Sequence, residues 1–463
     1  MNLYSVLEPI LLDVIKVISP LQADRETRLA IMSELRDVVV SVESLRGATV
    51  EPFGSFLSNL FTRGGDLDIS VDLPNSSYIS SAGKKRKQNL LGELQRALRK
   101  RGEFRKLQLI ANARVPILKL ESNHQNISCD ISIDNMAGQM KSIFLFWINE
   151  IDGRFRNMVL LVKEWAKAHN INNPKNGTLN SYSLSLLVVF HFQTCVPAIF
   201  PPLRDIYSQN LVAELQGVRA VVEGNIRETW TTNIARFRSD KRRKINRSSL
   251  SELFHSFIAK FCAISSKASE LGICPFTGRW ELIESNMRWL PNNHSLFIED
   301  PFERPANCAR AVSAKQLPRI SEAFEKTHFR LNSAIHDQNS LLPILTRPQT
   351  SIIISRGRHP RSNNGRYPKS QTLVHNSVHS PSPVQHQTQN KRLENRPSTS
   401  MVQQFHTQPV QQYNVQQLNV QPVQRYPHGQ HYQGQPVQQN EGQPARQYRS
   451  QARRKWRPKP SDK

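Results

Sequence analysis

The sequence predicts an α+β fold followed by a tail that cannot bury a core, and three observations support this prediction. Strand-like segments with alternating apolar residues gather between residues 50 and 135. Residues 137–320 instead repeat their apolar residues with the helical period. Beyond residue 345, Gln, Asn, Pro, His and Ser replace most aliphatic residues. Strands that gather first and helices that follow are the pattern of an α+β protein.

The net charge indicates the kind of binding partner, and the cysteine pattern indicates the redox state of the cellular compartment. The 463 residues carry a formal net charge of +25, and residues 341–463 alone hold 18 Lys and Arg against 3 Asp and Glu. This excess predicts an anionic partner, most simply nucleic acid, although it could also serve solubility. The five cysteines are scattered without paired spacing, which favours a reducing compartment over a disulfide framework or a zinc site.

Residues 1–48 predict two amphipathic helices separated by Ser19 and Pro20, and we expect both to pack on a later helical domain. The first apolar segment lacks a basic leader and contains Glu8 and Asp13. It therefore predicts neither a signal peptide nor a membrane span, and no other segment is apolar enough to cross a bilayer, so we expect no membrane partner.

The most informative stretch is PFGSFLSNLFTRGGDLDISV, residues 52–71. Asp66 and Asp68 are two residues apart in a strand-like run, so their carboxylates point to the same face. Such a pair favours a divalent cation, and oxygen ligands suit Mg²⁺ or Mn²⁺. Upstream, Gly54 lets the backbone approach a phosphate, and Ser55 can open a helix whose N–H groups attract anions. Nucleotidyl transfer requires this combination, although an Asp-x-Asp pair at a strand end can also be purely structural.

A third carboxylate, Asp130, stands at the centre of the alternating run ISCDISI, residues 127–133. On a neighbouring strand, it would complete a two-metal site with Asp66 and Asp68. One metal would activate an attacking hydroxyl and the other would hold the leaving pyrophosphate. Alone, Asp130 could be a solvated acid, but the set of three predicts catalysis. Between these motifs we expect a basic loop at residues 84–87, a helix and two strands, one of them at 114–120.

The helical part offers further anion-binding candidates. Lys163 and Lys167 share one helix face and repel each other unless an anion meets them, although surface lysines often pair this way. Ser181 and Tyr182 stand at the start of a long apolar helix, where free N–H groups can meet phosphate and a flat ring can stack on a base. The alternative role for Tyr182 is packing. A helix is expected at residues 250–263, after an irregular basic segment.

These motifs carry a resemblance. Gly54-Ser55, Asp66-x-Asp68 and Asp130 resemble DNA polymerase β-type nucleotidyltransferases. The runs LVKEWAKAHNI, GTLNSYSLSLLV and IEDPFE resemble the noncanonical poly(A) polymerases and terminal uridylyltransferases, most closely the plant small-RNA 3′ terminal uridylyltransferases. The resemblance implies a polymerase β-like palm at 49–136, packed against a helical central (poly(A) polymerase-associated) domain at 137–325, with the active site in the cleft between them.

The resemblance also implies the reaction and the role of each residue. The enzyme would add uridines from UTP, without a template, to the 3′ hydroxyl of small RNAs or RNA fragments that lack 2′-O-methylation, and so mark them for degradation. Two Mg²⁺ or Mn²⁺ ions would be bound by Asp66, Asp68 and Asp130. The triphosphate would be held by Gly54, Ser55, Lys163, Lys167 and Ser181, the base stacked by Tyr182, and its edge read by Asp300 and Glu303. Without the resemblance, Asp300 and Glu303 would be an N-cap and a first-turn acid.

Two residues depart from the family pattern and leave the choice between UTP and ATP open. Lys141 stands where the family usually has an Asn that contacts sugar and base, and Ala306 stands where uridylyltransferases carry a His that helps exclude ATP. Closeness to the plant subfamily favours UTP. The alternatives are a poly(A)-type adenylyltransferase, a catalytically silent RNA-binding relative and a synthetase of a nucleotide second messenger.

Residues 345–463 predict a disordered, basic, Gln- and Pro-rich tail. Interspersed Tyr and Arg favour weak multivalent association, so we expect a tether to RNA granules such as P-bodies, or to Argonaute-type or RNA-decay proteins; a passive linker is the alternative. The basic runs at 84–87 and 241–244 could contact RNA, act as import signals or be merely solvated. Nucleus and cytoplasm are the expected locations.

Overall fold

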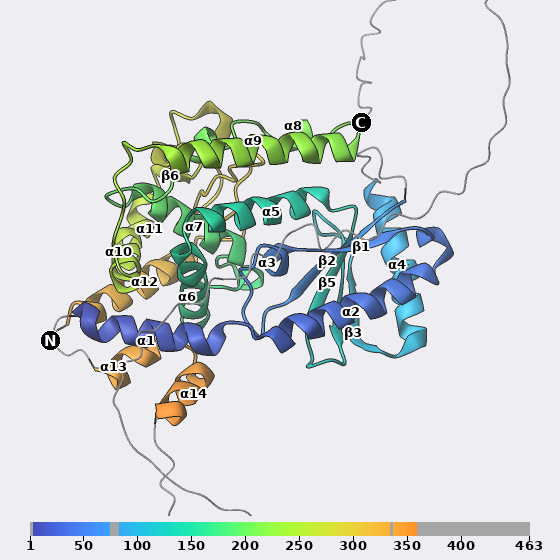
Figure 1. Ribbon diagram of the computed structural model, residues 1–463, viewed down its shortest axis with the longest axis horizontal. Helices are drawn as coiled ribbons and strands as arrows, with labels where there is room; N and C mark the ends of the chain where they lie inside the picture. Colours follow the sequence, from blue (N-terminus) through green and yellow to red (C-terminus); the bar gives the residue numbers. More distant parts are fainter. Residues whose placement is uncertain (1–2, 75–82, 334–336, 359–463) are drawn as a thin grey trace, which may run out of the picture. The chain divides into compact units, whose positions relative to one another are not determined.

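A five-stranded mixed sheet is built from residues 49–133, with strand order β1-β2-β5-β4-β3 (Figure 1). The computed structural model describes residues 3–74, 83–333 and 337–358. The strands are β1 (Thr49–Phe53), β2 (Leu67–Asp72), β3 (Phe104–Ile110), β4 (Ile117–Ser122) and β5 (Ser128–Ile133). β2 and β5 pair in parallel, and the other neighbours pair antiparallel. The predicted α+β fold is confirmed.

The sheet has one apolar and one polar face. Leu67, Ile69 and Val71 are fully buried on the apolar face, which is covered by α2 (Gln22–Val40) and α4 (Lys84–Arg101). The alternate residues of β2 face the other side, where α3 (Gly54–Leu57) and α5 (Met136–Ile151) pack. The two-residue period of a strand therefore places the acidic residues on the side that meets the rest of the chain.

The prediction that both N-terminal helices pack on the helical domain is wrong for the second helix. α1 (Leu3–Ile18) packs on four helices of that domain and of the segment after it: α6 (Arg154–Ala168), α10 (Leu250–Phe261), α13 (Gln338–Leu345) and α14 (Pro348–Arg358). Ile31, Met32 and Leu35 of α2 instead join the apolar core under the sheet. Both helices are amphipathic, and an apolar stripe does not specify which apolar surface covers it.

Two further expectations near the sheet are wrong. Residues 84–87, expected as a loop, form the first turn of α4, where Lys87 Nζ donates to the Asp134 carbonyl at 3.1 Å. Three strands, not two, follow this helix, because β3 was missed. Its pairing with β4 shifts register between Arg105 and Gln108, so its side chains do not alternate cleanly.

The other helices surround α6 and α7, whose side chains are buried on nearly every side. α7 is apolar nearly all round, as expected of a helix in the centre of a core, whereas α6 also buries the charged residues Lys163 and Glu164. The longer helices are α6 (Arg154–Ala168), α7 (Ser181–Thr194), α9 (Arg219–Ser239), α10 (Leu250–Phe261) and α12 (Leu317–Leu331). The shorter elements are α8 (Leu211–Glu214), α11 (Ile264–Lys267), β6 (Leu271–Cys274), β7 (Arg279–Leu282) and the 3-10 helices Glu43–Leu45, Pro174–Asn176, Leu203–Asp205 and Met287–Trp289.

α9 makes the segment before residue 240 more regular than expected, and aromatic rings anchor it. Trp230 stacks on Phe144 of α5 with ring centroids 4.6 Å apart, and Phe302 lies 4.6 Å from Phe144 on another side. These contacts tie α5, α9 and the loop around Phe302 into one core. The predicted helix at 250–263 corresponds to α10.

The folded part extends past residue 345, where the tail was predicted to begin. α13 (Gln338–Leu345) is followed by α14 (Pro348–Arg358), in which Thr350 and Ile354 are buried. The prediction is therefore wrong for residues 348–358, because a few buried side chains suffice to dock a short helix. The rest of the predicted tail lies outside the described residues. Within the described ranges, no helix is long and apolar enough to cross a membrane.

Candidate active site

The three predicted carboxylates meet on the polar face of the sheet. Asp68 of β2 lies directly opposite Asp130 of β5 in the parallel register, and Asp66 immediately precedes β2. Burial, followed by the charges of Asp130 and Asp66, raises the pKa of Asp68 to about 7. Burial also raises the pKa of Asp66, which the charge of Asp130 raises further. The pairing places Asp130 on the strand next to Asp68, as expected, while the joint catalytic role of the three acids stays a prediction.

Gly54 brings its backbone against the carboxylate of Asp68. Its φ is +65°, and a Cβ on this residue would lie 2.0 Å from Asp68 Oδ2, so no side chain fits. The Gly54 N–H donates to Ser142 Oγ of α5 at 2.7 Å, and Ser55 follows in the single turn of α3. The glycine turn therefore touches the carboxylates in space as well as preceding them in sequence.

Lys163 and Lys167 of α6 face these acids. Lys163 Nζ donates to the Leu60 carbonyl at 2.9 Å, and burial together with the charge of Lys167 lowers its pKa to about 8, against the attraction of Asp68. Burial and the charge of Arg347 lower the pKa of Lys167, while the charges of Glu164 and Asp66 oppose this shift. Two lysines thus share a low-dielectric site with the carboxylates, where an anion would stabilise their charged forms.

Glu164 stands between the two lysines in sequence, and its hydrogen bonds go to residues near the end of the described chain. Its carboxylate is buried and accepts from Arg347 Nη2 at 2.8 Å and from Thr350 Oγ1 at 2.7 Å. Arg347 and Thr350 belong to the segment where the tail was predicted, so sequence reasoning missed this contact. Their distance along the chain from α6 left no local signal.

The predicted base-binding residues form a second charged group. Tyr182 Oη donates to Asp300 Oδ1 at 3.3 Å, and Lys141 Nζ donates to Asp300 Oδ2 at 2.5 Å and lies 3.0 Å from Glu303 Oε2. Arg114 also pairs with Glu303, at 3.4 Å. Lys141, which departs from the family pattern, is thus held by both predicted base-reading acids.

Tyr182 and Asp300 also have the structural roles that were considered as alternatives, in part. Asn180 caps α7 by accepting from Ser183 N–H at 2.7 Å, which places Ser181 and Tyr182 in its first turn as predicted. Asp300 Oδ1 accepts the N–H groups of Phe302 and Glu303 at 3.0 and 3.3 Å. It therefore stabilises a turn, but no helix begins there in the described structure, since α12 starts at Leu317.

Lys119 of β4 forms an ion pair with Asp130, and sequence reasoning missed this residue. Lys119 lies opposite Asp130 in the antiparallel register, and its Nζ is 2.9 Å from Asp130 Oδ1. Alternation in RVPILKL could have indicated it, because Leu118 and Leu120 are buried on the other face. That signal becomes useful only once β4 is known to pair with β5.

The chemistry of the carboxylates suits a divalent cation, although their arrangement does not yet form a complete ligand set. Among the residues that the structure describes, no three Asp, Glu, His or Cys side chains are grouped so that they could hold a metal ion. Asp130 is turned toward Lys119. The donor set nevertheless consists of hard oxygens. Burial raises the pKa of Asp66 and Asp68, repulsion by the neighbouring carboxylates adds to it, and a cation would relieve both costs. The metal assignment thus stays a prediction.

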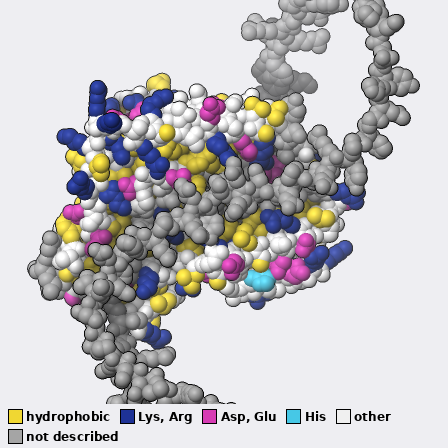
Figure 2. Space-filling view, in the orientation of Figure 1, with side chains coloured by type: hydrophobic (Ala, Val, Ile, Leu, Met, Phe, Trp, Pro, Cys, Tyr) yellow, Lys and Arg dark blue, Asp and Glu magenta, His cyan; other side chains and the backbone are white. Residues whose placement is uncertain are grey.

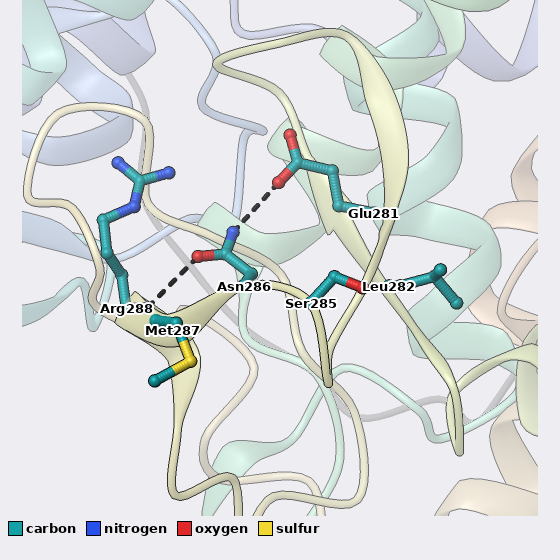
Figure 3. A pocket seen from close by; sticks show the side chains of 6 residues that line it. All are labelled: Glu281, Leu282, Ser285, Asn286, Met287 and Arg288. Carbon is teal, nitrogen blue, oxygen red and sulfur yellow. Dashed lines mark hydrogen bonds between the residues drawn. The ribbon is translucent and has the colours of Figure 1, made fainter.

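A surface pocket of about 480 Å³ lies elsewhere, at the β6–β7 hairpin (Figure 3). Asn286 spans it, donating to Glu281 Oε2 at 2.9 Å and accepting from the Arg288 N–H at 3.3 Å. None of the predicted site residues lines this pocket. We therefore centre the candidate site on the carboxylates.

A mixed sheet that carries an aspartate pair beside a glycine turn, joined to a helical body, is the arrangement expected of the nucleotidyltransferase class. Comparison with known proteins agrees. Residues 7–147 match the family described as poly(A) RNA polymerase, mitochondrial-like, central palm domain. Protein HESO1 of Arabidopsis thaliana is 62% identical over 340 residues, which are 73% of this chain and 66% of that protein. The chain belongs to the family of noncanonical poly(A) polymerases and terminal uridylyltransferases, as its motifs predicted.

More distant relatives differ in the nucleotide that their names state. Terminal uridylyltransferase cid1 of Schizosaccharomyces pombe is 28% identical over 305 residues, covering 62% of this chain and 69% of that protein. Human poly(A) RNA polymerase GLD2 is 28% identical over 295 residues, covering 63% of this chain and 57% of that protein. A solved cytoplasmic RNA terminal U-transferase superposes with a TM-score of 0.57 at 25% identity, covering 74% of this chain and 98% of that chain. The chain thus spans a little under two thirds of HESO1 and just over half of GLD2.

Proposed function

We propose that this chain is a template-independent terminal uridylyltransferase that adds uridines from UTP to the 3′ hydroxyl of RNA. The observation that carries the proposal is the pairing of Asp68 with Asp130 on adjacent strands, opposite Lys163 and Lys167. Carboxylates for a cation and ammonium groups for a triphosphate are the two requirements of nucleotidyl transfer. The likeness to terminal uridylyltransferase cid1 supports the same conclusion.

The proposed reaction needs no covalent intermediate on the protein. Bound Mg²⁺ or Mn²⁺ would supply Lewis-acid stabilisation of the phosphate oxygens, with Asp66, Asp68 and Asp130 as ligands. Asp130 would bind the cation nearest the RNA end and would help remove the proton of its 3′ hydroxyl. The 3′ oxygen bonds to the α-phosphorus while the bond between that phosphorus and the bridging oxygen breaks, and pyrophosphate leaves. The triphosphate is held by Lys163, Lys167, Gly54, Ser55 and Ser181.

UTP is the proposed substrate because of the group around Tyr182. In this proposal Tyr182 stacks on the base, while Asp300 and Glu303 accept hydrogen bonds from its edge and Lys141 donates one. Uracil presents one N–H donor between two carbonyl acceptors, so its edge fits acids and an ammonium side by side. Adenylyl transfer is the second candidate, because Ala306 places no bulk beside this loop and GLD2 is also a relative.

A tailing assay tests this proposal. The purified chain is given a labelled RNA with a free 3′ hydroxyl, Mg²⁺ or Mn²⁺, and each nucleoside triphosphate singly. We expect extension with UTP that is lost in the Asp66→Ala/Asp68→Ala variant. Extension mainly with ATP would favour the adenylyltransferase, and no extension with any nucleotide would favour the silent RNA-binding relative.

We further propose that the substrates are small RNAs or fragments without a terminal 2′-O-methyl group, and that the tail marks them for degradation. A methyl group on the neighbouring oxygen would crowd the 3′ hydroxyl beside Asp130. Two RNAs of one sequence, with and without the methyl group, should therefore differ in extension rate by at least tenfold. Equal rates would refute this substrate assignment.

Exposed basic residues favour RNA as the partner. They gather around the end of α9 and the start of α10, and Figure 2 shows Lys and Arg side chains over this region. The residues are Arg236, Arg238, Lys241, Arg242, Lys244 and Arg247. We propose that they contact the RNA body, and that residues 359–463 direct the enzyme to Argonaute-type or RNA-decay proteins and RNA granules in the nucleus and cytoplasm. A fluorescent fusion that ends at residue 358 should lose granule localisation; unchanged localisation would refute this role.

A further inference from the structure

Lys119 is the cation nearest to the acidic group on the sheet. Its Nζ lies 2.9 Å from Asp130 Oδ1, with side chains that are 29% and 24% exposed respectively. Leu118 and Leu120, its neighbours in β4, are buried on the opposite face. Strand alternation therefore directs Lys119 toward the acids and away from the apolar core.

The influence of Lys119 reaches all three acids. Burial lowers the pKa of Lys119, but its hydrogen bond to Asp130 and the charges of Asp130, Asp66 and Asp68 outweigh this and raise it. Asp66 and Asp68 both feel the attraction of Lys119 in return. The ammonium group of Lys119 thus already compensates part of the negative charge that a divalent cation would otherwise compensate.

We propose that Lys119 competes with the divalent cation for Asp130 and that, once displaced, it binds the phosphate next to the RNA 3′ end. This inference rests on the proposed function. One carboxylate oxygen cannot accept the ammonium proton and ligate a metal with the same lone pair. The RNA must bring its 3′ hydroxyl to Asp130, so its last phosphodiester lies one nucleotide away, within reach of a flexible lysine stem. Cation binding and capture of the RNA end become coupled steps.

The first test measures metal binding without turnover. Mn²⁺ binding to the full chain is followed by the EPR signal of the free ion, with neither RNA nor UTP present. Lys119→Met keeps the stem and removes the charge, and it should bind Mn²⁺ about threefold more tightly, because a partly exposed ion pair of ordinary strength no longer competes. Lys106→Met is the matched control: Lys106 pairs with Glu121 at 2.8 Å on the same sheet but is 75% exposed. Its Mn²⁺ affinity should equal that of the wild type.

The second test separates the two substrates. Lys119→Met should raise the KM for RNA at least fivefold and leave the KM for UTP within twofold, while Lys119→Arg should restore the KM for RNA. Unchanged or weaker Mn²⁺ binding in Lys119→Met overturns the competition, and an unchanged KM for RNA overturns the phosphate contact. A wild-type chain that extends no RNA refutes the proposed function instead, and the Mn²⁺ comparison still decides the competition. Circular dichroism of Lys119→Met and Lys119→Arg shows whether each variant is folded.

Discussion

Arg219 of α9 fastens the helical part of the molecule to the strand that carries Asp68, and its removal should cost substantial stability. Arg219 Nη1 donates to Asp72 Oδ2 at 2.8 Å, and Nη2 donates to Gln139 Oε1 at 2.8 Å. Asp72 is only 3% exposed, four residues beyond Asp68 in β2. Burial of a carboxylate is tolerated only while its charge is compensated.

The magnitude follows from what remains after Arg219→Met. Breaking a buried ion pair from one side typically costs about 3–5 kcal/mol. Asp72 keeps its hydrogen bonds from Ser70 Oγ and from Gln139 Nε2, so we expect the lower end, about 3 kcal/mol. Asp72→Asn should cost only about 1 kcal/mol, because it leaves a partly exposed Arg219 that still pairs with Glu223.

Urea denaturation at pH 7, followed by far-UV circular dichroism, measures these free energies of unfolding. The double variant Arg219→Met/Asp72→Asn should be more stable than Arg219→Met alone, because a neutral amide needs no counter-charge. If Arg219→Met stays within 0.5 kcal/mol of the wild type, or if the two losses simply add, Asp72 does not depend on Arg219 and our reasoning is wrong.

Three further predictions concern single side chains. Gly54→Ala should lower tailing at least a hundredfold, since a Cβ would lie 2.0 Å from the Asp68 carboxylate, whereas Gly64→Ala, which meets nothing within 4 Å, should stay active; equal activities would contradict this. Arg347→Met should raise the KM for UTP severalfold, because the buried glutamate it holds would turn toward the lysines of α6, and Arg347→Lys should recover part of the loss; an unchanged KM would argue against it. Burial lowers the pKa of His191 to about 3, so the folded chain binds fewer protons than the unfolded chain below pH 6.5. Its free energy of unfolding should therefore fall by about 1.4 kcal/mol per pH unit more steeply than that of His191→Gln between pH 6 and 4; parallel pH profiles would mean that His191 is protonated in the fold.

The features predicted well from the sequence are those that short-range geometry decides. Asp66 and Asp68 share a face because strand side chains alternate, and Ser181 and Tyr182 stand at the start of α7 because a long apolar run follows them. Both conclusions need only a few neighbouring residues. The family resemblance then placed Asp130 and the lysines of α6 in one site, which the strand pairing and the electrostatic coupling to the acids support.

The features that sequence reasoning missed depend on which elements meet. Arg219 and Asp72 are 147 residues apart, and Arg347 and Glu164 are 183 apart, so no local pattern connects them. The packing of α2 under the sheet is likewise not apparent from its own sequence, because its apolar stripe could cover either the sheet or the helical domain. The position of Lys119 beside Asp130 follows only from the pairing of β4 with β5.

The docking of α14 changes how a shortened version of this enzyme should be designed and interpreted. A truncation guided by composition would stop near residue 345 and would discard Arg347 and Thr350 together with the low-complexity sequence. The buried Glu164 would then lose its partners beside the proposed nucleotide site. The resulting loss of activity would be attributed to the low-complexity region, although its cause would be a buried Glu164 without hydrogen-bond partners. A truncation after residue 358 avoids this confusion, and comparing the two shortened chains separates recruitment by the tail from support of the catalytic body.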